Sequence, residues 1–293
     1  MPTDRAIRIT AAIDAIPSLP AIVARVLEVT DNPESTADEL LEVLVADPAY
    51  TAKILKLANS AFYSRVREIA TVKQAVVVLG YEEIRNMVVA TAVFNNFQKI
   101  KKVPGFDAMG FWRHAFLTGL AARMLAVSLK KNTGQLFVAG LIHDIGKLVI
   151  LMALPDEYAK ILKMTGNRGL ENLDAETHLL GVTHAETGMR LFSRWMYPDL
   201  LLRTTGSHHQ PHLASQNRAA ILVVHLADYL AHIAVETRGG GDIVFPEGCF
   251  AQETVSAART FGIPWNGEAI KILADQLNIL MDDQAGVLAM FLS

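Results

Sequence analysis

The sequence predicts an all-α protein built from about a dozen helices. Three observations support this fold class: apolar residues recur at helical spacing, the alternation that is typical of strands is nearly absent, and capping residues and helix breakers divide the chain at helix-length intervals. The composition is 51% hydrophobic and 19% charged over 293 residues, which indicates a globular chain with a large core rather than a disordered one.

Helix signals are dense in the first hundred residues. Asn32-Pro33 interrupts the first apolar pattern, and Thr36 followed by Glu39 is typical of a capping box. Gly80 is a suitable C-cap because glycine readily takes the left-handed backbone conformation. The helices expected here run from Pro20 to about Thr30, from Thr36 to about Ala46, from Asp47 over TAKILKLANS, over TVKQAVVVLG, and from Tyr81 to about Gln98.

Two breaks organise the rest of the chain. Pro104 and Gly105 interrupt the segment KKVPGFDAMG, and RGGGD at 238–242 precedes two or three further helices. Between the breaks, helices are expected over 108–130, 134–153, 155–166, 174–181, 184–196 and 217–235. The sequence therefore predicts an N-terminal helical part over 1–104, a helical core over 105–236 and a C-terminal helical extension over 237–293.

Charge gives no reason to expect nucleic acid as a partner. The formal net charge is -3, and the basic clusters Lys99-Lys101-Lys102 and Lys130-Lys131 lie near expected helix ends, where they favour the helix dipole. AVVVLGYEEIRNMV has the outline of a helix-turn-helix. Its second helix begins with Glu82 and Glu83, which would repel phosphates, so core packing is the preferred interpretation.

The sequence favours a cytoplasmic protein without a membrane segment. The first residues carry charges where a signal peptide needs an apolar stretch, and no uncharged apolar run approaches the ~18 residues that span a bilayer. Cys249 is the only cysteine, which excludes an internal disulfide and fits a reducing compartment. We expect Cys249 to be a partly buried, small apolar residue.

Residues 141–150, LIHDIGKLVI, place His143, Asp144 and Lys147 inside an aliphatic run. Burying a charge without a partner costs several kcal/mol, so the pattern needs a metal ion or a buried ion pair. On a helix Lys147 lies on the same face as His143 and Asp144, one turn further on. Asp144 and Lys147 could by themselves form the ion pair, and the stretch alone leaves both interpretations open.

All nine histidines lie between His114 and His232. A single histidine on an apolar helix is more often a hydrogen-bonded core residue than a ligand, but an ordered set of histidines and acids favours a metal site. Imidazole and carboxylate are ligands for Zn, Fe, Mn or Ni. His178, His212, His225 and His232 are interpreted as surface or packing residues. The predicted set is His114, His143, Asp144, His184, His208, His209 and Asp228.

Several motifs in order resemble the HDOD (HD-related output domain) family, within the HD superfamily of metal-dependent phosphohydrolases. They span about residues 15–235 and include LPAIVARVLEVT, ADPAYTAKILKLANSAFYSR, IATVKQAVVVLGYEEIRNMVV, FWRHAFLTGLAARMLA, AGLIHDIGKLVI, LLGVTHAETGMRLFSRW and ILVVHLADYLA. The resemblance implies an HD-superfamily helical bundle with an N-terminal helical subdomain, found in bacterial signalling proteins. By similarity to the HD-GYP branch, the predicted set matches metal-ligand positions, and Lys147 matches a lysine that contacts substrate phosphate.

One departure from HD-GYP enzymes limits the resemblance. After His208 and His209 those enzymes carry an acidic residue and a Gly-Tyr-Pro segment, whereas this chain reads HHQPHLASQN, so cyclic di-GMP phosphodiesterase activity is not expected. The resemblance favours a signalling module that acts mainly through a protein partner and keeps one or two divalent transition-metal ions. The alternative is a metal-dependent phosphohydrolase for a nucleotide or other phosphoester, with Lys147 and Asp144 as catalytic residues.

Overall fold

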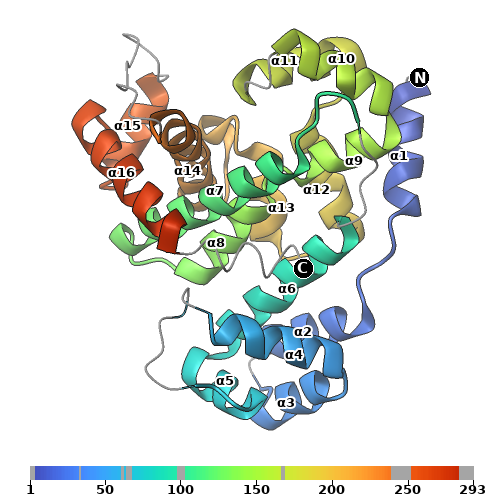
Figure 1. The fold of residues 1–293 in the computed structure, drawn as a ribbon, viewed down its shortest axis with the longest axis vertical. Coiled ribbons are helices and arrows are strands. Elements are labelled where there is room, and N and C mark those ends of the chain that lie inside the picture. The colour runs from blue at the N-terminus through green and yellow to red at the C-terminus, as the bar shows by residue number, and fades with distance from the viewer. Residues whose placement is uncertain are drawn as a thin grey trace.

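The computed structural model describes residues 4–32, 34–60, 63, 68–97, 103–165, 169–238 and 252–283. Every regular element in these ranges is a helix, so the all-α prediction is confirmed. The helices form a lower N-terminal group and a larger upper group, with α6 running from one into the other (Figure 1). Cys249, most of the RGGGD segment and the Lys99-Lys101-Lys102 cluster lie outside the described residues.

The N-terminal lobe consists of α2 (Ala21–Asp31), α3 (Ala37–Val45), α4 (Pro48–Ala58) and α5 (Val72–Leu79), which pack on one another and on α6 (Tyr81–Phe97). Local caps define its helices. Thr36 accepts a hydrogen bond from the Glu39 backbone N–H at 3.3 Å, and Asp47 accepts one from Ala49 at 3.0 Å. Thr71 and Gln74 form a capping box. The predicted ends of the helices in this lobe are therefore confirmed to within a residue or two.

Helix α6 belongs to the core and not to a DNA-reading surface. Residues 84–94 are all buried, because α6 packs against α2, α4 and α5 on one side and α8 on the other. Even Arg85 is buried, where its guanidinium lies 2.7 Å from the Asp31 carboxylate. The core-packing interpretation of the α5–α6 pair is confirmed.

The upper group is centred on two long helices, α7 and α14, which pack against each other. Helix α8 packs on α7, while α12 packs on α9 and α13. Its elements are α7 (Ala108–Ser128), α8 (Thr133–Ile142), α9 (Ile145–Ala153), α10 (Pro155–Thr165), α11 (Gly169–Leu180), α12 (His184–Arg194), α13 (Asp199–Ser207), the 3₁₀ helix Pro211–Leu213 and α14 (Arg218–Thr237).

The structure corrects the prediction of one helix over 134–153. Helix α8 ends at Ile142 and α9 begins at Ile145, so His143 and Asp144 form a turn between them. The flanking aliphatic residues gave no sign of this break, because both helices are buried on nearly every side. Helix α11 also begins earlier than the predicted residue 174, at Gly169.

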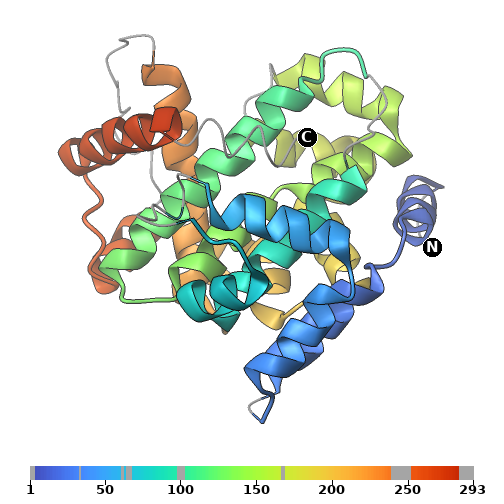
Figure 2. The ribbon, with the colours of Figure 1, turned by 60° about the horizontal axis from the view of Figure 1, so that its bottom comes forward.

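A first helix, α1 (Asp4–Ala15), was not predicted. It lies apart from the N-terminal lobe, against α9 and α12 (Figure 1 and Figure 2). Arg194 donates a hydrogen bond to the Ile16 carbonyl at 2.8 Å, and the Trp195 indole donates one to the Pro17 carbonyl at 3.1 Å. The division at residue 104 stays a prediction, and the first helix packs on the segment that follows it.

Two further described helices, α15 (Gln252–Thr260) and α16 (Gly267–Asp283), complete the upper group. Helix α16 packs on α14 and α7, and α15 packs on α14 and the 3₁₀ helix. Two helical stretches, Thr133–Ala153 and Arg218–Thr237, are long and apolar enough to cross a membrane by length and composition. They are 89% and 61% buried inside the molecule, as core helices are.

Candidate metal centre

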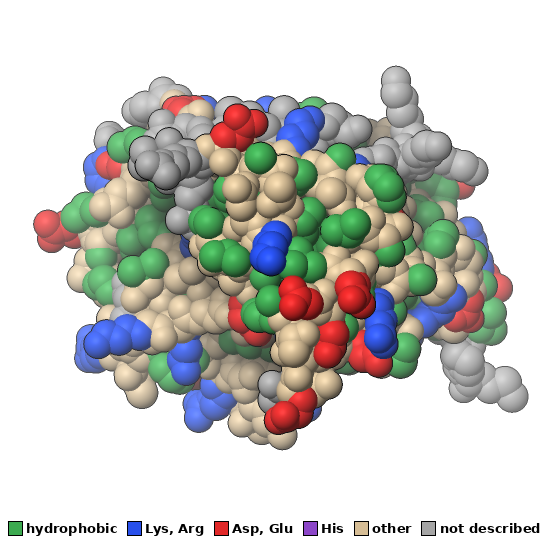
Figure 3. Space-filling view, turned by 90° about the horizontal axis from the view of Figure 1, so that it is seen from below, with side chains coloured by type: hydrophobic (Ala, Val, Ile, Leu, Met, Phe, Trp, Pro, Cys, Tyr) green, Lys and Arg blue, Asp and Glu red, His purple; other side chains and the backbone are tan. Residues whose placement is uncertain are grey.

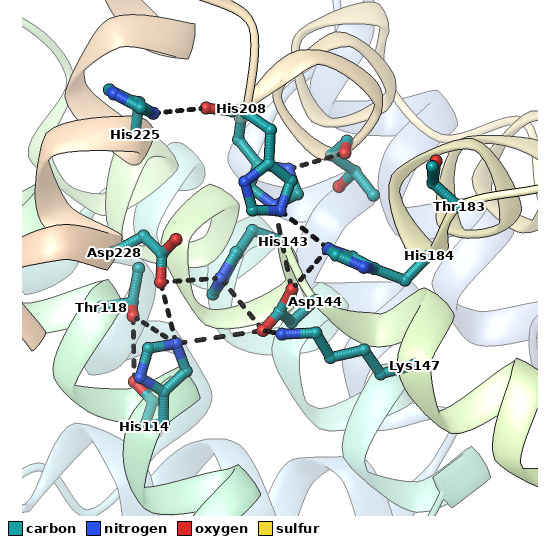
Figure 4. Close-up of polar contacts among 12 residues, drawn as sticks. His114, Thr118, His143, Asp144, Lys147, Thr183, His184, His208, His225 and Asp228 are labelled. Carbon is teal, nitrogen blue, oxygen red and sulfur yellow. Dashed lines mark hydrogen bonds and ion pairs between the residues drawn. The ribbon is translucent and has the colours of Figure 1, made fainter. Parts of the chain in front are cut away.

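Five parts of the upper group supply the ionisable side chains that the sequence singled out, and Figure 4 shows most of them pointing toward one centre. The whole predicted set, together with Lys147, lies within a network of short contacts there. His114 comes from α7, His143 and Asp144 from the α8–α9 turn, His184 from the start of α12, His208 and His209 from the end of α13, and Asp228 from α14.

Glycines allow these helices to approach closely enough. A Cβ atom on Gly146 would lie 1.9 Å from the His184 carbonyl oxygen and 2.7 Å from the Gly188 nitrogen, so α9 and α12 touch backbone to backbone. Asp144 lies only two residues before Gly146, so this contact places His184 beside Asp144. The glycine in HDIGK is therefore required by packing between helices that are far apart in sequence.

The Asp144 carboxylate is the middle of the network. Its Oδ1 atom lies 3.1 Å from His184 Nε2 and 3.8 Å from His208 Nε2. Its Oδ2 atom lies 2.5 Å from Lys147 Nζ and 3.4 Å from His143 Nε2. The two interpretations left open by the sequence are thus compatible, because one oxygen pairs with the lysine while the other faces histidines.

Asp228 forms a second meeting point on the side of α7 and α14. Its Oδ1 atom lies 3.0 Å from His114 Nε2, 3.6 Å from His143 Nε2 and 3.5 Å from His232 Nε2. His209 completes the opposite side, with its Nε2 atom 2.9 Å from His184 Nε2. The centre therefore extends from His209, through Asp144, to Asp228.

Hydrogen bonds on the far side of the rings orient three of the histidines. His143 Nδ1 lies 2.7 Å from the Gly140 carbonyl, and His208 Nδ1 lies 2.8 Å from the Thr205 carbonyl. A carbonyl only accepts, so Nδ1 donates in both rings and Nε2 is the atom that faces the centre. This outer hydrogen bond is the usual arrangement for histidines that bind metals.

Glu176 plays the same part for His184. Its carboxylate is fully buried and lies 2.8 Å from His184 Nδ1, and it also accepts the His184 backbone N–H at 2.7 Å. Sequence reasoning missed Glu176, since an acid eight residues before a histidine and on a different helix has no local signal. His184 is in addition placed by the capping box of Thr183 and Glu186, which confirms Thr183 as the N-cap.

Burial and neighbouring charges shift the pKa values of several groups at the centre. Burial opposes the ionisation of Asp144, but His143 and Lys147 outweigh it and hold the pKa of that carboxyl well below its usual range. Burial also lowers the pKa of His184, but the Glu176 carboxylate outweighs it and raises the pKa to about 9. Burial and the neighbouring His143 lower the pKa of His208 to about 3. Asp144 therefore stays charged and His208 stays neutral as a ligand must, whereas His184 carries a proton that an ion bound to its Nε2 atom would displace.

Several buried polar atoms have no hydrogen-bond partner among the described residues, and they cluster at this centre. They include His143 Nε2, Asp144 Oδ1, His208 Nε2 and Asp228 Oδ1. Ligand atoms about 2.1 Å from one ion, at angles of about 90–109°, lie about 3.0–3.4 Å from each other. The separations of 2.9–3.1 Å from His184 to His209 and Asp144 match this spacing, so the residues present fit a divalent ion.

A cavity of about 340 Å³ opens beside the centre. Lys147, Asp144 and His114 form part of its wall, so the ionisable cluster is reached from outside through this space. The remaining wall is contributed by α7, α10, α14 and the segment before α7, and comprises Phe106, Asp107, Gly110, Phe111, Arg113, Tyr158, His232, Val235 and Glu236.

The four histidines outside the predicted set have three different surroundings. His178 and His212 are exposed, as expected. His225 Nδ1 lies 2.8 Å from the His208 carbonyl oxygen and so supports the end of α13. His232, interpreted from sequence as a surface or packing residue, lies at the centre beside Asp228 and His114. The spacing Asp-x-x-x-His, which places two ligands on one helix face, was the signal that could have found it.

A sequence profile of the HDOD domain matches residues 16–211 of the chain, which is well over half of it. The chain belongs to the HDOD family. The resemblance seen in the sequence is thereby confirmed. The profile ends before α14, so Asp228 and His232 lie beyond the matched segment of this HDOD protein.

Solved structures resemble this HDOD protein over almost its entire length. A candidate phosphohydrolase of Shewanella amazonensis is 27% identical, covers 98% of both chains and has a TM-score of 0.73. An HDOD domain protein of Geobacter sulfurreducens with unknown function is 24% identical, with a TM-score of 0.75 over 99% of this chain and 100% of that one. A Treponema pallidum protein is 26% identical over 77% of this chain, which spans 44% of that protein's length.

Proposed function

We propose that the chain is a bacterial signal-transduction module that keeps an HD-type metal site and acts mainly through a protein partner. The observation that carries the proposal is the convergence of the seven predicted ligand residues around Asp144, with unpartnered Nε2 and carboxylate atoms facing inward. Family membership supports the signalling role. A chain whose one cysteine excludes an internal disulfide suits work in the cytoplasm.

The residues would divide the work at the metal site. Asp144, His184, His208 and His209 would hold an ion on the α12–α13 side, and His114, His143 and Asp228 provide ligands on the α7–α14 side. When bound, a divalent ion supplies Lewis-acid polarisation and a more acidic water. Gly140, Thr205 and Glu176 fix the ring orientations, as the hydrogen bonds above describe. Lys147 balances part of the buried negative charge through its contact with Asp144.

A protein partner requires accessible apolar side chains, and the N-terminal lobe offers some. Val45 on α3 and Val77 and Val78 on α5 are exposed, on two helices that pack against each other. Large contiguous apolar patches are typical of interaction surfaces, and these three side chains are exposed apolar positions on neighbouring helices. We expect such a partner to bind the lobe while the metal centre lies in the upper group.

The second candidate function is a metal-dependent phosphohydrolase. The cavity favours it, because Lys147 and Arg113 line one space that also reaches Asp144. Two cations near a metal site are suited to phosphoryl oxygens. The similar Shewanella protein is described as a candidate phosphohydrolase. The missing acidic residue and Gly-Tyr-Pro segment after His209 favour the signalling role instead.

Turnover measurements on the metal-loaded full chain separate the two functions. The chain is loaded with Mn²⁺, Fe²⁺, Ni²⁺ or Zn²⁺ and given a chromogenic phosphodiester and a set of nucleotides. Asp144→Asn removes the central charge at nearly constant volume, and His178→Ala removes an exposed histidine as the matched control. Turnover that is absent in Asp144→Asn and retained in His178→Ala establishes a hydrolase. If the wild-type chain binds metal but all three proteins show the same background turnover, the result supports the signalling module.

A further inference from the structure

We infer that His232 is a metal ligand that joins His114 and Asp228 to bind an outer ion, so that the centre holds two ions. This inference rests on the proposed metal site. The inference goes beyond the proposed site because it adds His232 as a ligand of a second ion. His232 lies outside the predicted set and outside the segment that the family profile matches, and it lines the cavity.

The distances carry the assignment. Asp228 Oδ1 lies 3.0 Å from His114 Nε2 and 3.5 Å from His232 Nε2. Ligand atoms that share one ion at about 2.1 Å are separated by about 3.0–3.4 Å when the angle between them is about 90–109°. Oδ1 of Asp228 is also buried with no hydrogen-bond partner among the described residues. The separation from Asp228 to His114 lies in this range, the separation from Asp228 to His232 lies just above it, and the ligand atoms of all three residues lie within 4.8 Å of one another.

The outer triad shares no member with the deepest group of ligands, but a third group, His114, His143 and Asp144, takes one member from each and joins them. Asp144, His184, His208 and His209 form one group whose ligand atoms all lie within 4.8 Å of one another, and His114, Asp228 and His232 form another with no member in common. His143 lies between the groups, with its Nε2 atom 3.4 Å from Asp144 and 3.6 Å from Asp228. Two groups joined by a shared neighbour are the arrangement of a two-metal site.

The elements that carry the triad hold it in place. Asp228 and His232 are four residues apart on α14, so both side chains lie on the face that packs against α7, where His114 lies. Exposure rises from 13% for the Asp228 side chain to 15% for His114 and 38% for His232. An ion held here would have its open positions toward the cavity, which His114 and His232 both line.

A packing role for His232 is the rival explanation. Its ring lies against the His114 ring, with centroids 4.4 Å apart and planes 33° apart. His232→Phe tests this directly, because phenylalanine keeps an aromatic ring beside His114 and removes the nitrogen. His232→Ala removes both. His178→Phe, at an exposed position on α11, is the matched control for the substitution itself.

The experiment is a Mn²⁺ titration of the chelator-stripped full chain, followed by desalting and elemental analysis. Wild type and His178→Phe should retain about two ions per chain, and His232→Phe and His232→Ala about one. The affinity for the second ion should fall at least about tenfold in both His232 variants. The spin-coupled spectrum of a Mn²⁺ pair should be present in wild type and lost in His232→Phe, and melting of the stripped chains checks that each variant is folded.

The possible outcomes test the role of His232 and the proposed metal site separately. A wild-type chain that binds one ion, or a His232→Phe chain that binds the second ion as tightly as wild type, overturns the inference and leaves the proposed metal site standing. A wild-type chain that binds no ion at neutral pH after reconstitution overturns the proposed metal site itself. Loss of the second ion in His232→Ala alone, with His232→Phe unchanged, shows packing and also overturns the inference.

Discussion

The N-terminal lobe and the histidine-rich upper group are both helical, but they bury different chemistry. The lobe has an apolar interior, with Val23, Leu40 and Ile54 fully buried. The upper group buries Asp144 and Glu176 among its aliphatic residues, and with them several histidines. In the described residues, every group of side chains that could hold a metal lies in the upper group.

The difference shows what each region is built for. Apolar burial stabilises a lobe directly, whereas buried carboxylates cost free energy unless a cation or a set of hydrogen bonds compensates them. The underside of the molecule, where the lobe lies, shows apolar, acidic and basic side chains side by side, and none of the described side chains on that face is a histidine (Figure 3). The lobe therefore combines an apolar interior with a varied surface, whereas the upper group buries charges at a cost in stability that the proposed ion would offset.

The largest expected effect is on the lobe interior. Leu40→Ala should lower the free energy of unfolding by about 2–5 kcal/mol, because it leaves a cavity at a fully buried position. Val77→Ala, at a side chain that is 76% exposed in the same lobe, should change it by less than about 0.5 kcal/mol. Chemical denaturation measures both. A Leu40→Ala protein that folds but has lost its metal would break the separation between the two regions.

Metal removal should act on the upper group. An ion present at about a hundred times its dissociation constant stabilises the folded chain by about 2.7 kcal/mol. Thermal melting with and without chelator should therefore show a metal-dependent shift in wild type and in Leu40→Ala alike. The shift should disappear in Asp144→Asn. A shift of equal size in Asp144→Asn would place the bound ion elsewhere in the chain.

Gly146→Ala should disturb the contact that joins α9 to α12. The added methyl group would overlap the His184 carbonyl, and overpacking of this kind costs about 1–3 kcal/mol. Metal affinity should fall as well, because His184 moves away from Asp144. Gly110→Ala is the control, since the nearest atoms that its Cβ would meet belong to the exposed side chain of Asp107 and not to backbone. Unfolding curves and metal titrations measure both effects. If Gly146→Ala and Gly110→Ala had the same stability and metal affinity, the contact between α9 and α12 would not position the site.

The last expected effect is confined to metal affinity and arises at Glu176, which contacts His184 and is not a predicted ligand. Glu176→Gln should weaken metal binding about 10- to 100-fold by removing the carboxylate that orients and charges the ring. Glu186→Gln changes an exposed glutamate in the capping box of α12, the helix that carries His184, and should leave metal affinity unchanged because glutamine can also complete the box. Competition with a chelator of known affinity measures both constants. Equal affinities in the two variants would remove Glu176 from the site.

Local signals explain how much of the fold could be predicted. Thr36, Asp47 and Thr183 bond to backbone within three residues, so their helix starts are readable from the sequence. The turn at His143 and Asp144 was not readable, because Gly146 must meet α12, which is a contact between distant segments. Helix α1 was missed for a similar reason, since only Ile9 and Ile13 are buried and their partners lie on other helices.

The contrast between local signals and contacts between distant segments also explains how much of the candidate site could be predicted. Residue type and order predicted the set from His114 to Asp228, and the structure brings all of its members together. Glu176 is on a helix that carries no other site residue, and only packing places it beside His184. His232 had a readable spacing from Asp228, but spacing alone does not show that both face His114.

The most direct test of the central claim is a crystal structure of the full chain grown with Mn²⁺ or Zn²⁺ and measured at the absorption edge of the metal. The account predicts an anomalous peak about 2.0–2.2 Å from a carboxylate oxygen of Asp144 and from the Nε2 atom of His184. Diffraction that shows no anomalous peak among these side chains, or a peak bound only elsewhere on the chain, would contradict it.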